Sequence, residues 1–171
     1  MELLIPGLVL VAVMVWASTK IKKSAAEAYA EETVTSDRFT ITKPEDLIIP
    51  MNADSPFLFE ARTKEHETIR GDSVPASVVS IGERKGESFD AVCDQIRSAA
   101  AKIVDEDHHR EGARVCLITA EEPEGETTYS VSYKVVEAAN SVLVLRARTL
   151  PEQSEDLLRK IDSMVRSFSA N

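Results

Sequence analysis

The sequence has few of the residues on which several protein classes depend. Its 171 residues include two cysteines, six glycines and seven prolines, and aromatic side chains make up 5% of the total. Two cysteines are too few for a disulfide-stapled miniprotein or for a zinc module with several cysteine ligands. The scarcity of glycine and proline, together with the lack of any low-complexity tract, excludes collagen-like and linker-rich architectures. The composition is therefore that of an ordinary globular domain.

The motifs of the common catalytic and nucleotide-binding classes are also missing. The sequence contains no P-loop, no G-x-G-x-x-G and no G-x-S-x-G turn. Of the three histidines, His66 lies among charged residues in an expected exposed loop. Cys93 and Cys116 occupy apolar positions, far apart in the sequence, where small buried core residues are expected. We therefore expect a protein that is not an enzyme and that has no cofactor.

Positive charge is scarce beyond the N-terminal segment. The whole chain has a net charge of −9. Residues 1–30 have a net charge of +1, so the remaining residues have a net charge of −10. Nucleic-acid binding depends on clustered Lys and Arg side chains that neutralise phosphates. An acidic domain without such a cluster is not expected to have a nucleic acid as its partner.

The one long hydrophobic run lies at the N terminus and predicts a transmembrane anchor over residues 1–19. Residues 3–17 carry no charge, and a helix over residues 1–19 would be about 28 Å long, close to the thickness of a bilayer core. The basic residues follow this run, which argues against the alternative of a cleaved signal peptide. By the positive-inside rule, they place the following domain in the cytoplasm. The residues expected at the membrane interface are Trp16, Lys20, Lys22 and Lys23.

The rest of the chain predicts a helical stalk and then an α+β domain. Residues 20–36 combine the basic flank with Ala- and Glu-rich sequence typical of a helix, and residues 37–171 form the domain. One helix begins after its N-cap Ser88 and ends at Gly112, and a second starts at Thr149 or Leu150. The predicted order is an N-terminal transmembrane helix followed by βββαβββα, with an antiparallel sheet packed by two helices. The expected strands cover residues 39–42, 57–64, 76–82, 115–119, 129–135 and 142–148.

A charged segment at the end of the first predicted domain helix, residues 105–111, is a candidate metal site. In a helix, Asp105 and His109 would share one face at the i, i+4 spacing, which is compatible with a divalent metal. No third ligand can be assigned from elsewhere in the sequence, and cationic residues are common at helix C-termini. We therefore prefer a solvated helix end and expect no metal.

Two clusters of charge on the predicted sheet are candidate binding surfaces. An acidic hairpin tip would suit a basic protein partner, and the alternative is a solvated turn that protects a sheet edge from aggregation. A basic patch of Arg62, Lys64, Arg146 and Arg148 would form only if their strands are neighbours. The acidic residues of the candidate docking tip are Glu121, Glu122, Glu124 and Glu126.

The element order, the segment RFTITKP at residues 38–44 and the closing LLRKIDSMVRSFSAN at residues 157–171 resemble the PsbP-like fold. That group includes extrinsic photosystem proteins, a Ran-binding nuclear import factor and many bacterial proteins with an anchor or signal before the domain. The resemblance covers roughly residues 37–170 and implies a non-enzymatic binding or assembly role. No site motif of the group can be matched, so it assigns no functional residues.

These observations predict a single-pass membrane protein whose acidic domain binds or helps to assemble a protein partner. The alternative is a membrane-tethered enzyme or small-ligand-binding domain with a pocket between sheet and helix, near His108 or Arg146. A polar pocket with convergent titratable groups would favour this alternative, whereas a filled core with a flat acidic surface would favour partner binding.

Overall fold

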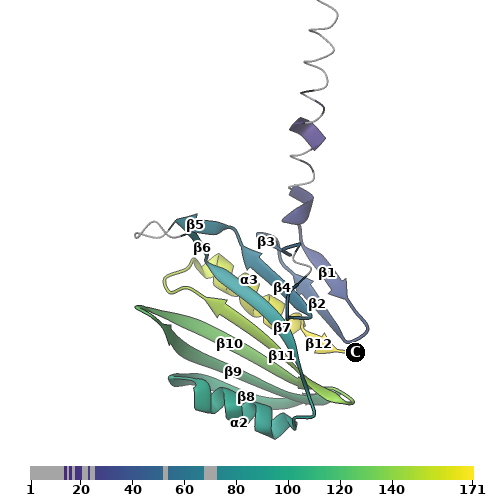
Figure 1. The fold of residues 1–171 in the computed structure, drawn as a ribbon, viewed down its shortest axis with the longest axis vertical. Helices are drawn as coiled ribbons and strands as arrows, with labels where there is room; N and C mark the ends of the chain where they lie inside the picture. The colour runs from purple at the N-terminus through teal and green to yellow at the C-terminus, as the bar shows by residue number, and fades with distance from the viewer. Residues whose placement is uncertain are drawn as a thin grey trace, which may run out of the picture.

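A seven-stranded antiparallel sheet forms the centre of the molecule (Figure 1). The computed structural model describes residues 14, 16, 18–20, 23, 26–51, 54–67 and 73–171. The sheet has the strand order β3-β4-β7-β11-β10-β9-β8, so the long strands β7 and β9 to β11 lie inside it. Its strands are β3 (Leu47–Ile48), β4 (Phe59–Thr63), β7 (Ser77–Lys85), β8 (Lys102–Glu111), β9 (Ala113–Glu124), β10 (Thr127–Glu137) and β11 (Ser141–Thr149).

Two helices, α2 (Phe89–Ala99) and α3 (Glu155–Ser167), cover opposite faces of this sheet (Figure 1). Successive side chains of a strand point to opposite faces. In β11, Val142 accordingly packs in the core cluster of α2, while the adjacent Leu143 packs in the cluster of α3. The middle of the sheet is thus buried on both sides.

Two smaller sheets complete the fold. The first contains β1 (Glu32–Thr35), β2 (Phe39–Lys43) and β12 (Ser169–Ala170), and the second pairs β5 (Glu65–Glu67) with β6 (Ser73–Pro75). The ring of Phe39 in β2 lies 6.1 Å from that of Phe59 and 6.2 Å from that of Phe168, between ring centroids. These aromatic contacts join the three-stranded sheet to the core beneath α3.

A buried lysine at the end of β2 holds the N-terminal segment against the domain. Lys43 is 1% exposed, and its Nζ donates hydrogen bonds to the carbonyl oxygens of Leu47, at 3.0 Å, and of Ala30. Burial lowers the pKa of this amine, and the nearby Glu32 opposes that shift. The carbonyl partners compensate for the removal of the charge from water.

The predicted order βββαβββα is wrong because the described chain is mostly sheet. The six expected strands overlap β2, β4, β7, β9, β10 and β11, but the prediction omitted β1, β3, β5, β6, β8 and β12. All six omitted strands lie at the edges of their sheets or in the two-stranded sheet. Strands that bury at most one side lack the sustained apolar alternation from which strands are predicted.

The largest local error concerns the first helix. Its predicted N-cap is confirmed, since Ser88 Oγ accepts a hydrogen bond from the Ala91 amide at 3.2 Å. The helix ends at Ala99, however, and the residues up to Glu111 form β8. Gly112, with φ of 76°, makes the turn between β8 and β9 instead of ending a helix. A glycine with positive φ serves both purposes, so the sequence did not distinguish them.

The predicted extent of the stalk and the predicted start of the second helix are also wrong. The stalk was expected to be helical up to residue 36, but β1 begins at Glu32 and pairs with β2. The second helix does not start at Thr149 or Leu150. Thr149 ends β11, and α3 begins after Ser154, whose Oγ accepts a hydrogen bond from the Leu157 amide at 3.2 Å.

No helix within the described part of the chain is long and apolar enough to cross a membrane, which corrects the fold class predicted above. Of residues 1–19, the structure describes positions 14, 16, 18 and 19, and the remainder of the predicted anchor lies outside the described residues. Membrane attachment and the cytoplasmic placement of the domain remain predictions.

Phe168 is the side chain on which the α3 face most depends. It is fully buried and packs against Phe39. Phe168→Ala should lower the free energy of unfolding by about 3–5 kcal/mol, because it leaves a cavity that the core cannot refill. Leu158→Ala, on the exposed side of α3, should change it by less than about 1 kcal/mol. Urea unfolding followed by circular dichroism measures both, and equal effects would contradict this view of the core.

Candidate binding cleft

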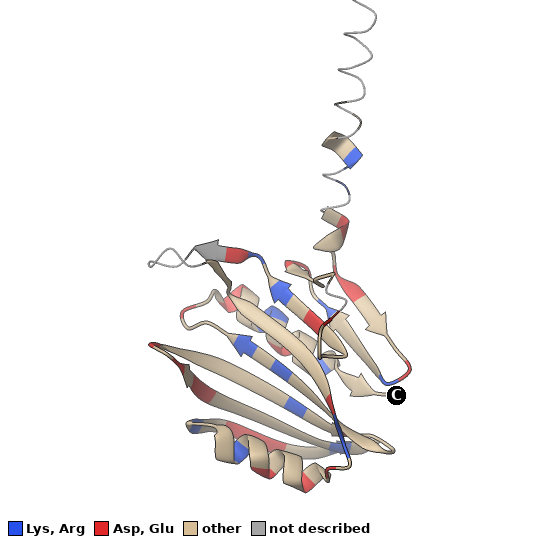
Figure 2. Ribbon diagram, viewed as in Figure 1, with Lys and Arg blue, Asp and Glu red and all other residues tan. Residues whose placement is uncertain are grey.

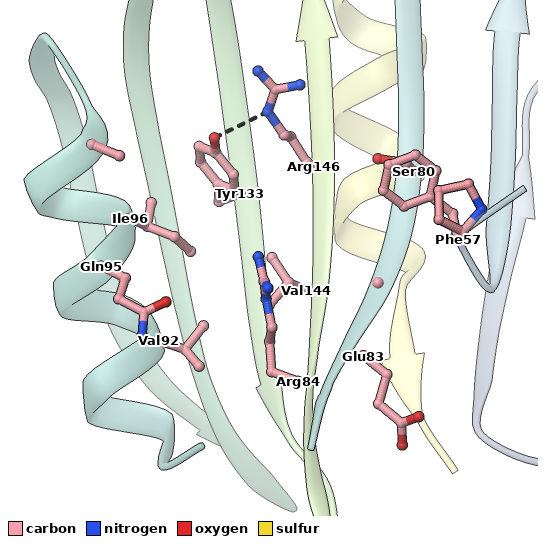
Figure 3. A pocket seen from close by; sticks show the side chains of 13 residues that line it. Phe57, Ser80, Glu83, Arg84, Val92, Gln95, Ile96, Tyr133, Val144 and Arg146 are labelled. Carbon is pink, nitrogen blue, oxygen red and sulfur yellow. Dashed lines mark hydrogen bonds between the residues drawn. The ribbon is translucent and has the colours of Figure 1, made fainter. Parts of the chain in front are cut away.

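An open cleft of about 440 Å³ lies beside α2, on the part of the sheet face that this helix leaves uncovered (Figure 3). Side chains of α2 form one wall and the segment before β4 forms the other, with β7, β11 and β10 as the floor. The lining residues are Pro56, Phe57, Ser80, Gly82, Glu83, Arg84, Val92, Gln95, Ile96, Ala99, Tyr133, Val144 and Arg146.

Strand register builds the floor of the cleft from a polar row and an apolar row. Ser80, Arg146 and Tyr133 lie opposite one another on β7, β11 and β10, and directly opposed residues point to the same face. Two positions along, Gly82 lies opposite Val144. A Cβ added at Gly82 would meet nothing within 4 Å, so the space above this residue is open.

Arg146 and Tyr133 form a hydrogen-bonded group with Glu122 at one end of the cleft. Arg146 Nε donates to the Tyr133 hydroxyl at 3.0 Å, drawn as the dashed line in Figure 3. Arg146 Nη2 lies 2.5 Å from Glu122 Oε2, and the Tyr133 hydroxyl donates to Glu122 Oε1. Burial and the contact with Glu122 raise the pKa of Tyr133 to about 12, against the opposing effect of Arg146. Tyr133 is therefore a neutral hydrogen-bonding group at physiological pH.

Arg84 supplies a charge that is free to meet a ligand. Its side chain is exposed and lines the cleft, and it has no ion-pair or hydrogen-bond partner among the described residues. The neighbouring Glu83 instead forms ion pairs with Arg38 and with Lys85, the latter at 3.6 Å. The cleft thus combines apolar walls, a neutral polar end and one unpaired guanidinium.

The acidic hairpin tip predicted as a docking surface is largely engaged within the chain. Glu121 lies 2.8 Å from Lys102, Glu122 pairs with Arg146, and Glu124 pairs with Arg148. Glu126 also has an interaction within the chain. Figure 2 shows basic positions across the central strands beside acidic positions near the end of β9. The docking role of this tip stays a prediction.

The structure also answers whether the strands of the predicted basic patch are neighbours. Arg62 and Arg148 both lie opposite Val78, so β4, β7 and β11 bring the two arginines to one face. Each has an acidic partner, because Arg62 lies 3.9 Å from Glu65 and Arg148 pairs with Glu124. These ion pairs leave less positive charge than the sequence indicates.

Neither the candidate metal pair of Asp105 and His109 nor the solvated helix end preferred over it is formed, because residues 102–111 are a strand. Four residues of strand separate Asp105 from His109 by about 13 Å, too far for one ion. Alternation instead brings Glu106 and His108 together, 2.6 Å apart, on the face that α2 covers. Cys116 lies opposite His108, and its thiol also contacts that of Cys93.

The residues predicted at a membrane interface are partly described. The Lys20 ammonium lies 5.1 Å from the ring centroid of Trp16, whose side chain is exposed. Lys23 forms a loose pair with Glu27 at 3.9 Å, and Lys22 lies outside the described residues. Their role at a membrane remains a prediction.

The fold can now be compared with known proteins. The sequence matches no protein-family model and no curated protein. A crystal structure of LpqN, involved in cell envelope biogenesis of Mycobacterium tuberculosis, matches with TM-score 0.55 and 12% identity over 83% of this chain and 91% of that one. The fold is PsbP-like.

Two further structures share this PsbP-like fold. The solution structure of cyanobacterial PsbP (CyanoP) from Synechocystis sp. PCC 6803 matches with TM-score 0.52 and 11% identity, over 83% of this chain and 92% of that one. The Ran-binding protein Mog1p of Saccharomyces cerevisiae matches with TM-score 0.50 and 11% identity, over 82% and 95%. The fold implied by the sequence resemblance is thus confirmed, and identities this low show the fold alone.

The alternative hypothesis placed a pocket near Arg146, and this residue does line the cleft. The other key lining residues, Phe57, Gly82, Arg84 and Ile96, were missed as site residues. Gly82 and Arg84 lie two residues apart on β7, whereas Phe57 precedes β4 and Ile96 lies on α2, so the packing of three separate segments brings the four residues together. No local spacing in the sequence signals this.

The contacts of Tyr133 at the end of the cleft predict a raised pKa for its hydroxyl. In an alkaline absorbance titration, the tyrosine ionisation that is missing from Tyr133→Phe should have its midpoint at a pH of about 12. Glu122→Gln should lower this midpoint, because it removes a carboxylate that disfavours the tyrosinate. An unchanged midpoint in Glu122→Gln would contradict the contact described here.

Proposed function

We propose that the domain is a non-catalytic binding module that takes up a segment of a protein partner in the cleft beside α2. The single observation that supports this most strongly is the guanidinium of Arg84, which has no partner among the described residues and lines a cleft with apolar walls. An arginine without an internal partner is available to a carboxylate of a ligand. The favoured ligand is therefore a segment that carries an apolar side chain close to an acidic one.

The size and shape of the cleft favour a side chain or two of a larger partner. Its volume of about 440 Å³ lies in the range of ligand sites. The described lining residues form a floor and two walls. This shape suits a peptide segment whose two ends continue outside the cleft. Phe57, with 44% of its surface exposed, offers an aromatic contact of the kind enriched at protein interfaces.

The chemistry of the lining supports binding over catalysis. The described residues around the cleft include no histidine and no cysteine. The carboxylate that reaches it, Glu83, is paired with Arg38 and Lys85, and Tyr133 stays protonated. General acid–base catalysis needs a group whose pKa lies near the working pH. Mog1p, which has the same fold, is itself described as a Ran-binding protein.

A peptide selection tests this function. Random peptides displayed on phage are selected on the full-length chain, and the recovered peptides should combine apolar and acidic residues. Gly82→Leu should abolish their binding, because it fills the open floor of the cleft. Arg84→Glu should weaken binding at least tenfold, a loss of about 1.4 kcal/mol or more. Fluorescence anisotropy measures the affinities.

The matched control is Thr35→Leu, which adds similar apolar bulk to the exposed strand β1, outside the lining of the cleft. It should bind the selected peptides as tightly as the unaltered chain. Peptides that bind Gly82→Leu and Arg84→Glu with unchanged affinity would overturn the proposal, as would a selection that enriches none.

A further inference from the structure

A second cluster of functional side chains lies under α2, away from the cleft. Glu106 Oε1 lies 2.6 Å from His108 Nε2, and Cys116 Sγ lies 3.7 Å from that nitrogen and 3.9 Å from that oxygen. Together these three residues present one ligand atom each within 4.8 Å of the others. None of them lines the cleft.

The register of the β8–β9 hairpin creates this cluster. His108 lies directly opposite Cys116, and Glu106 precedes His108 by two residues on the same face of β8. From α2 above, Cys93 brings a second buried thiol into contact with that of Cys116. The consecutive elements α2, β8 and β9 thus bring these side chains to one point.

We propose that Cys116, His108 and Glu106 bind a thiophilic divalent cation of the zinc class. A thiolate, an imidazole and a carboxylate are donors that zinc accepts, and a water molecule would take the fourth position of its usual tetrahedral coordination. With zinc–ligand bonds of about 2.0–2.3 Å, neighbouring ligand atoms lie about 3.4–3.8 Å apart. The 3.7 Å from Cys116 Sγ to His108 Nε2 falls within this range, and the 3.9 Å to Glu106 Oε1 lies just above it. The shorter distance between Glu106 and His108 is a hydrogen bond, which the ion replaces.

Arg97 holds the carboxylate of the site in place. Its guanidinium donates to Glu106 Oε1 at 2.5 Å and to Oε2 at 3.2 Å, and also contacts His108 Nε2 at 3.1 Å. When Oε1 turns to the cation, Arg97 keeps Oε2 and orients the carboxylate, as outer hydrogen-bond partners do in metal sites. One thiolate and one carboxylate then balance the charge of the divalent ion.

Cobalt is the spectroscopic probe for this site. One equivalent of Co²⁺ added to the reduced full-length chain should give thiolate-to-cobalt charge-transfer absorption, and excess Zn²⁺ should abolish it. Cys116→Ser should remove most of this absorption, because it removes a thiolate ligand. His108→Gln should weaken Co²⁺ binding at least tenfold, and this variant should fold because the side chain that it changes is exposed.

The opposite face of β8 provides the matched control. His109 pairs there with Asp107 at 3.0 Å, so the same strand presents a second histidine and carboxylate without the thiols. His109→Gln should bind Co²⁺ like the unaltered chain. The proposal is overturned if the unaltered chain gives no charge-transfer absorption, or if His108→Gln and His109→Gln have equal effects. Because His108→Gln decides the question alone, it also does so where Cys116→Ser fails to fold.

Discussion

The arrangement of the molecule depends on how little of one sheet face α2 can cover. A helix is about 10 Å wide, or about two strand spacings of 4.8 Å, whereas seven strands span six such spacings. The helix has eleven residues and packs on β10, with its cysteine and arginine directed at β8 and β9. The floor over β7 and β11 therefore stays open beside it. Both the cleft and the thiol cluster follow from this one placement.

The other face of the sheet is built for stability. There α3, β2 and β12 close over a core in which Phe39, Ile41, Met164 and Phe168 are almost fully buried. Lys134 also reaches that side and donates to the carbonyl oxygen of Arg166 at 2.9 Å, so that its buried ammonium has a partner. Because the core does not need the α2 face to be filled, that face can carry polar rows and an unpaired arginine.

The sequence predicts an element correctly where its apolar residues recur regularly along the whole segment. Residues 129–135 and 142–148 alternate regularly, because they lie in interior strands, and they were predicted as strands. Residues 102–111 form an edge strand of mostly charged residues, and Ile103 and Val104 extend the helical spacing of α2 by chance. Treating this segment as a helix assumed a period of 3.6 residues, which places Asp105 and His109 on one face. The strand has a period of 2, which places Glu106 and His108 on one face instead. The contact between Cys93 and Cys116 and the lining of the cleft depend on strand register, which no local pattern fixes.

We propose the cleft beside α2 as the place where a partner binds. The most direct measurement is amide chemical-shift mapping of the full-length chain by NMR during titration with a selected peptide. The account predicts that the largest shifts fall on β7 around Gly82 and Arg84 and on the wall of α2 around Ile96. Shifts confined to the hairpin tip between Glu121 and Glu126, or to α3, would contradict it.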